Sequence, residues 1–177
     1  MKTRSFLFTL AWAAVLPAIS LPSCSEDKPE APAEVYFSST AVRTILMTCN
    51  SDNTFNDSTC SVGTIRYAGN VNRGTVIATL AGGGDDLLEK YNTLRKSQCL
   101  LLPKNNYELL TPSLTIENGR KISEEGRFTL KNIAALDTAQ TYLLPVTILS
   151  LDATADVTLH ELKRTSWWVI SSTLTRP

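Results

Sequence analysis

The feature that most constrains this chain is a series of short apolar segments interrupted by turn residues, which begins near Val62. Apolar residues alternate at Ile65 and Tyr67 and cluster across residues 76–80, and Gly and Asn residues separate these two segments. Such short runs are typical of strands, because the interruptions come too often for long helices. The pattern predicts a mainly β fold and a hairpin across residues 65–80.

One segment departs from the strand pattern. Gly82-Gly83-Gly84 ends the second predicted strand, and Asp86 with Glu89 three positions later is typical of a capping box at the start of a helix. Four apolar residues follow at helical spacing: Leu87, Leu88, Tyr91 and Leu94. We expect a short amphipathic helix that turns these four residues inward and ends by about Ser97.

Strand signals return after this helix. Residues 100–110 indicate an irregular buried corner, since Pro103 and two asparagines interrupt any period. Asn118-Gly119 is a strong turn signal between segments 113–117 and 127–130. Residues 142–151 form the longest strand candidate, and Pro145 inside it favours an edge position or a bulge.

The last apolar run, Trp167 to Ile170, is expected to close the sheet. Many short strands, one helix and frequent turns together predict an antiparallel β-sandwich with one short helical insertion. We expect a single domain over residues 35–177.

The first residues have a different character. Lys2 and Arg4 precede an apolar run from Phe6 to Leu16, which is the layout of an export signal and is shorter than the roughly 20 residues of a membrane span. Leu21-Pro22-Ser23-Cys24 resembles the lipobox of bacterial lipoproteins. We therefore expect residues 1–23 to be removed and Cys24 to carry lipid; the alternative is a secretory signal followed by a cysteine that forms a disulfide.

Residues 24–34 are poor in large apolar side chains and predict a semi-extended tether. Its acidic part, residues 25–30, resembles the tag that carries many Bacteroidetes lipoproteins to the outer face of the outer membrane. The alternative is a plain solvated tether. We expect a lipid-anchored outer-membrane protein that faces the cell exterior and contacts the membrane through Cys24.

Charge and cysteine content limit the partners. The 17 basic residues balance the 17 acidic ones without a Lys/Arg cluster, so nucleic acid is not an expected partner. Cys49 and Cys60 flank a turn-rich stretch and could form a disulfide or remain two small buried thiols, and the state of Cys99 is left open. Their spacing does not fit structural zinc, and no metal or cofactor is expected.

Candidate catalytic groups are few. His160 is the only histidine, and no serine or carboxylate partner for it can be identified. Asp85-Asp86 and Glu124-Glu125 could supply the carboxylate pair of a glycosidase, but adjacent acidic residues are usually solvated charges. The glycines at 82–84 could cradle a phosphate, although the following aspartates would repel it. We expect a protein that is not an enzyme.

Several phrases of the body resemble one Bacteroidetes lipoprotein domain of unknown function, the family numbered seventeen thirty-five. They occur in the family's order: residues 76–80, 88–92, Leu102-Pro103 with Tyr107, 114–119, Tyr142 to Ile148, and the aromatic ending Trp167 to Ile170. The resemblance implies an N-terminal immunoglobulin-like β-sandwich module, often found ahead of a glycoside hydrolase or lectin-like domain. Because the sequence ends at Pro177, we expect no such downstream module. The family offers no catalytic residues to transfer.

This resemblance implies a glycan-binding or scaffold module of a polysaccharide-utilisation system, with polysaccharide or other surface lipoproteins as partners. Sugar rings stack on aromatic faces, so the candidate contacts are Trp167, Trp168, Tyr107 and Tyr142. In a strand the two tryptophans point to opposite faces, so one should be core and the other more exposed. The alternative is an assembly or adhesion component that pairs with other chains through a sheet edge.

Overall fold

The computed structural model describes residues 32–47, 58–70, 72–154 and 156–172. The chain divides into residues 1–30 and a compact unit of residues 31–177, which has its own hydrophobic core. The strands of this unit are β1 (Ala33–Phe37), β2 (Val42–Met47), β3 (Ser58–Gly63), β4 (Ile65–Ala68), β5 (Val76–Gly82), β6 (Leu100–Leu101), β7 (Tyr107–Leu109), β8 (Ser113–Ile116), β9 (Gly126–Leu130), β10 (Thr141–Ala153), β11 (Val157–Leu159) and β12 (Thr165–Ser172). The helices are α1 (Asp85–Arg95) and the short 3-10 turns η1 (Lys104–Asn106), η2 (Ile133–Ala135) and η3 (Glu161–Lys163).

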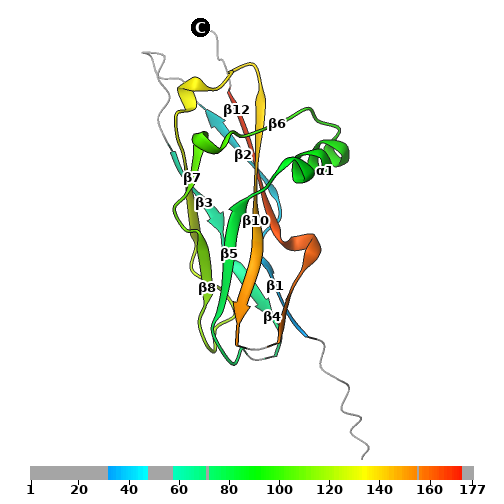
Figure 1. Cartoon of the computed structure of the whole chain (residues 1–177), viewed down its shortest axis with the longest axis vertical. Helices are drawn as coiled ribbons and strands as arrows, with labels where there is room; N and C mark the ends of the chain where they lie inside the picture. Colours follow the sequence, from blue (N-terminus) through cyan, green and yellow to red (C-terminus); the bar gives the residue numbers. More distant parts are fainter. Residues whose placement is uncertain (1–31, 48–57, 71, 155, 173–177) are drawn as a thin grey trace, which may run out of the picture. The chain divides into compact units, whose positions relative to one another are not determined.

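One layer of the unit is a sheet in the order β2-β12-β10-β5-β8, which Figure 1 shows around the long strand β10. Strand β10 pairs antiparallel with β12 and β5, while β2 runs parallel to β12, and the short β6 runs parallel to β10. The second layer consists of two smaller sheets, β3-β9-β7 and β11-β1-β4. The fold is therefore a mainly β, immunoglobulin-like sandwich with one inserted α-helix, as the sequence predicts.

The core lies between the two layers. Strands β4 and β5 alternate buried and exposed residues, so each buries one face. Phe128 of β9 and Trp168 of β12 meet across the core, with ring centroids 5.1 Å apart. Full burial of aromatic and aliphatic side chains from both layers stabilises their packing, at about 1.5–3 kcal/mol per large side chain.

Strand β10 is buried on both faces from Tyr142 to Ile148, and helix α1 covers its outer side at Leu143. Tyr91 of α1 packs in a second cluster with Leu143 and Cys99, and Trp167 lies against this cluster. The helix ends at Arg95, which confirms the predicted stop before Ser97. Leu94, however, is 71% exposed, so the apolar face is narrower than predicted.

The start of α1 corrects the predicted capping box. Its N-cap is Gly84, which makes no side-chain cap hydrogen bond, and both Asp85 and Asp86 lie in the first turn. The helix begins two residues too early for Asp86 to act as the cap. Acidic side chains in a first turn still favour the helix through its dipole.

The predicted hairpin over residues 65–80 is wrong in its pairing. The strands β4 and β5 both exist, but β4 pairs with β1 and β5 pairs with β10 and β8. The two strands therefore lie in different layers. The turn residues mark where the strands stop, and they do not determine which strands become neighbours.

Pro145 also lies elsewhere than expected. Its strand β10 is central, and the register shift occurs between Ile148 and Ser150. Pairing of β10 with β5 begins at Val146, and the Pro145 carbonyl accepts a hydrogen bond from the Gly83 N–H at 2.7 Å. The missing N–H of the proline thus falls at the end of this ladder, where it disturbs the sheet least.

Candidate functional site

Two of the four candidate aromatic contacts are inside the sandwich. Trp168 is 6% exposed and Tyr142 is 7% exposed, and both belong to the main core. The Tyr142 hydroxyl accepts a hydrogen bond from the Asp137 N–H at 3.0 Å. Neither ring presents a face to solvent, which confirms that one of the paired tryptophans is core.

The other two candidates are half-buried on different faces. Trp167 lies on the outer face of the large sheet, where its ring centroid is 5.5 Å from that of Tyr91. Tyr107 packs against the main core, and burial raises the pKa of its hydroxyl. The four aromatic residues therefore do not lie together on one surface, and a sugar contact at Trp167 or Tyr107 stays a prediction.

The cysteine predictions fall partly outside the described residues, as Cys24 and Cys49 do. Cys60 is half-buried on β3, and desolvation raises the pKa of its thiol more than a hydrogen bond with Ser58 lowers it. A Cys49–Cys60 disulfide stays a prediction. Cys99 is a buried free thiol in the cluster beneath α1.

The sequence candidates for catalysis are spread over the unit. His160 follows β11 and packs edge-on against Tyr36. The Gly83 N–H is used by the Pro145 carbonyl and Gly84 caps α1. Within the described ranges, no group of three His, Cys, Asp or Glu side chains could hold a metal ion.

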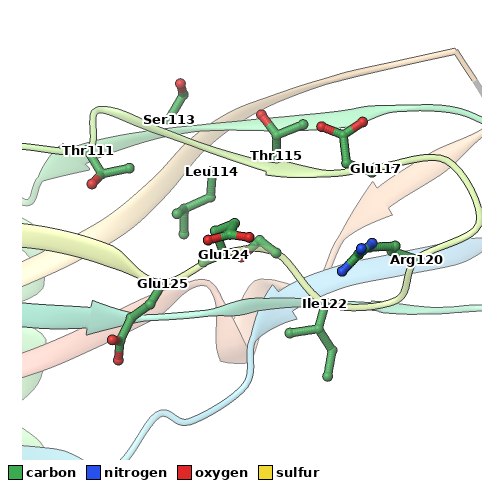
Figure 2. A pocket seen from close by; sticks show the side chains of 10 residues that line it. Thr111, Ser113, Leu114, Thr115, Glu117, Arg120, Ile122, Glu124 and Glu125 are labelled. Carbon is green, nitrogen blue, oxygen red and sulfur yellow. Dashed lines mark hydrogen bonds between the residues drawn. The ribbon is translucent and has the colours of Figure 1, made fainter.

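A groove of about 370 Å³ lies along the edge strand β8. Figure 2 shows its lining side chains on two neighbouring stretches of chain. They are Thr111, Ser113, Leu114, Thr115, Glu117, Arg120, Ile122, Ser123, Glu124 and Glu125. Hydroxyl, carboxylate and guanidinium groups thus share one concave surface, which can both donate and accept hydrogen bonds.

One end of the groove is shaped by a tight turn. The Arg120 N–H donates to the Glu117 carbonyl at 2.9 Å, and Gly119 has a φ of +79°, which glycine adopts without strain. Beneath the turn, the 2% exposed side chain of Asn72 donates from Nδ2 to the carbonyls of Glu117 and Arg120, at 2.9 and 3.2 Å. This buried amide fixes the position of both charged residues.

The second wall is held to β4 by the backbone. Arg66 and Ile122 form an isolated antiparallel bridge, and the Ser123 N–H donates to the Ile65 carbonyl at 3.1 Å. In return, the Ile65 N–H donates to the Ser123 hydroxyl at 3.0 Å. The wall is therefore rigid where it carries Glu124 and Glu125.

The groove carries three carboxylates and one guanidinium. The Ser61 hydroxyl donates to Glu125. Among the described residues, ion pairs join Lys131 to Glu108 and Arg164 to Glu161, and neither pair involves the groove. The guanidinium of Arg120 and the carboxylate of Glu117 are consequently available to a ligand.

Sequence reasoning found part of this groove. It named Glu124 and Glu125 as a candidate pair, and the structure places Glu117 with them along the same groove. It missed Glu117 and Arg120. These two charged residues directly precede and follow the Asn118-Gly119 turn in the sequence, and this position was the signal that could have identified them. Their approach to Glu124 depends on the contact between β4 and residues 121–123, which no local pattern encodes.

None of the helices in the described ranges is long and apolar enough to cross a membrane. No sequence among curated proteins matches the chain. A family model for an N-terminal domain matches residues 28–154.

Solved structures from Bacteroides share the fold. A candidate carbohydrate-binding protein from Bacteroides ovatus is 16% identical, with a TM-score of 0.65, and the match covers 80% of this chain and 37% of that one. A two-domain protein of unknown function from Bacteroides fragilis is 12% identical, with a TM-score of 0.59 and coverages of 80% and 46%. A Bacteroides ovatus multidomain protein that includes DUF1735 is 16% identical, with a TM-score of 0.54 and coverages of 80% and 45%.

The chain thus spans less than half of each of these three structures, and at such identities the likeness shows the fold alone. The family model, in contrast, matches more than half of the chain. The chain belongs to this family of N-terminal domains.

Proposed function

We propose that this chain is a non-catalytic glycan-binding or scaffold module of a polysaccharide-utilisation system, held at the outer face of the outer membrane by lipid on Cys24. The groove along β8 is the observation that carries the glycan-binding part. Sugar hydroxyls both donate and accept hydrogen bonds, and the groove offers carboxylate acceptors at Glu117 and Glu124 beside a guanidinium donor at Arg120.

The fold gives coarser support to a glycan-related role. One structure with this fold is a candidate carbohydrate-binding protein, and the chain covers 37% of its length. A module of this size is compatible with a glycan-binding or scaffold role within a larger protein complex.

A non-catalytic role is supported by the surroundings of the carboxylates. A glycosidase needs one carboxyl group kept protonated, which usually requires burial in an apolar pocket. Glu117, Glu124 and Glu125 are all exposed residues, and His160 is not among the residues that line the groove.

A glycan array probed with residues 31–177, followed by calorimetric titration of each glycan bound, tests the groove. Arg120→Ala and Glu124→Gln each remove charge-assisted hydrogen bonds, so we expect each to weaken binding about tenfold or more. Glu89→Gln on α1 is the matched control and should bind normally. Binding that both groove variants leave unchanged would exclude the groove, and silence across diverse neutral and acidic glycans would favour a scaffold role.

Pairing through a sheet edge is the second candidate function. Within the described ranges β8 pairs only with β5, and its residues Ser113 to Ile116 carry no charge that would repel another strand. Addition of a strand would slow amide hydrogen exchange in β8 when neighbouring surface lipoproteins are mixed with this chain. Unchanged exchange in β8 in a complex that nevertheless forms would exclude this mode.

A further inference from the structure

A row of outward-facing side chains crosses the sheet β11-β1-β4. Val35 and Phe37 of β1 are buried, so Tyr36 between them points to the outer face. Tyr36 is directly opposite Arg66 of β4, and Arg66 in turn is bridged to Ile122. On the other side of Tyr36, His160 continues the row.

Tyr36 contacts two further residues on the outer face, His160 and Lys163. The rings of Tyr36 and His160 meet edge to face, with centroids 5.8 Å apart. The Lys163 ammonium lies over the Tyr36 ring, 4.8 Å from its centroid. We call Ile122, Arg66, Tyr36, His160 and Lys163 the Tyr36 row.

The charge of the row is positive and available. Arg66 and Lys163 are exposed, and neither forms an ion pair with a described residue. The nearby acid Glu161 is paired with Arg164 at 3.4 Å, while Glu34 lies two positions before Tyr36 on β1. One cation therefore lies over a partly exposed aromatic ring, and a second lies on the neighbouring strand.

Neighbouring strands are about 4.8 Å apart, so the four residues from Ile122 to His160 span about 14 Å. Ile122 is 42% exposed and also lines the groove. The row is thus a flat surface that begins at the groove and leads across the sheet to Tyr36.

We propose that the Tyr36 row binds an acidic saccharide, one that carries carboxylate or sulfate groups. The apolar face of a sugar ring packs on Tyr36 in place of the exposed Lys163 side chain, and the displaced Lys163 ammonium and the Arg66 guanidinium bind the anionic groups of the sugar. This inference rests on the proposed glycan-related role, but it uses a surface whose chemistry is opposite to that of the acidic groove.

Calorimetric titration of residues 31–177 with three oligosaccharides tests the proposal: oligogalacturonate, a sulfated oligosaccharide and a neutral oligogalactoside. We expect at least one acidic oligomer to bind and to weaken as salt rises. Tyr36→Ala should weaken it about tenfold, and Lys163→Gln and Arg66→Gln about threefold to tenfold each. Lys90→Gln on α1, an equal loss of charge elsewhere, should have no effect, and thermal unfolding checks that each variant is folded.

Each result separates the two surfaces. Acidic oligomers that bind Tyr36→Ala as tightly as the unaltered chain would overturn the row, as would the absence of any acidic binding. Equal binding of a polyglutamate peptide, with the same variant effects, would overturn the assignment to saccharides. If the neutral oligomer binds, Arg120→Ala abolishes this binding and no acidic oligomer binds, the row is overturned and the groove proposal stands. If an acidic oligomer binds, Tyr36→Ala weakens this binding and the neutral oligomer does not bind, the groove proposal is overturned.

Discussion

Among single residues, Trp167 and Trp168 differ most sharply in their surroundings although they are adjacent in the chain. The Trp168 ring packs between Phe128 and the Arg43 guanidinium, which lies 5.0 Å from its centroid, whereas Trp167 is half-buried beneath Tyr91. Trp168→Ala should therefore lower the free energy of unfolding by about 3–5 kcal/mol. Trp167→Ala should cost clearly less, because part of that ring is already in water.

Urea unfolding of residues 31–177 measures both losses. Leu162→Ala is the control: this side chain is 82% exposed, and its removal should change stability by less than about 0.5 kcal/mol. Equal losses for the two tryptophan variants would contradict their placement on opposite faces of β12.

Residue-level reasoning succeeds where a backbone rule acts alone. Strand alternation predicts that one tryptophan is core, and Asn118-Gly119 forms a turn in which Gly119 has a positive φ. The same alternation in residues 33–37 would have revealed the outward Tyr36. Sequence reasoning instead chose aromatics by type, and Trp168 and Tyr142 proved to be core because large apolar rings are drawn into the interior.

Among the elements, α1 is attached to the sandwich through few side chains. Tyr91 is the only buried residue of α1, and it packs against Trp167. The Asn92 side chain closes the C-terminal end, since it donates to the Cys99 carbonyl at 2.9 Å and accepts from the Cys99 N–H at 3.0 Å. The helix should consequently be able to open without unfolding of the sheets.

Tyr91→Ala should release this helix locally. We expect amide hydrogen exchange in α1 to become at least about tenfold faster, with little change in β10 and β12, because the sheets keep their own core. Hydrogen-exchange mass spectrometry measures this difference. Leu94→Ala on the same helix, where the side chain is 71% exposed, should leave the exchange unchanged. Equal acceleration in α1 and β10 would show that the helix and the sheet open together.

From residue 65 onward most element positions followed from local patterns, whereas strands β1, β2 and β3 and the partners of the strands were not predicted. The strands at 65–68, 76–82 and 141–153 follow local alternation and β-branched residues, which the sequence carries directly. Whether β4 joins β1 or β5 depends on the burial of whole faces across the sandwich, so the predicted hairpin failed. Pro145 was tolerated in a central strand because β5 ends beside it, which again is a property of two distant segments.

For the whole molecule, the proposed location depends on the sulfur atom of Cys24, which is expected to carry the lipid. Several acyl chains together give lasting membrane attachment, because each buried methylene contributes about 0.8 kcal/mol. Cys24→Ser should move the protein from the membrane fraction to the soluble fraction of the producing cells and remove the lipid mass from the mature chain. Cys99→Ser, which alters a buried thiol in the body, should remain in the membrane fraction.

Surface exposure is tested separately: protease added to intact cells should digest the unaltered protein, whereas replacing Glu26, Asp27 and Glu30 by alanine should leave it lipidated but protected. Membrane retention of Cys24→Ser would refute the anchor, while digestion of the alanine variant would refute only the acidic sorting signal, because the anchor and the signal occupy different residues of the same tether.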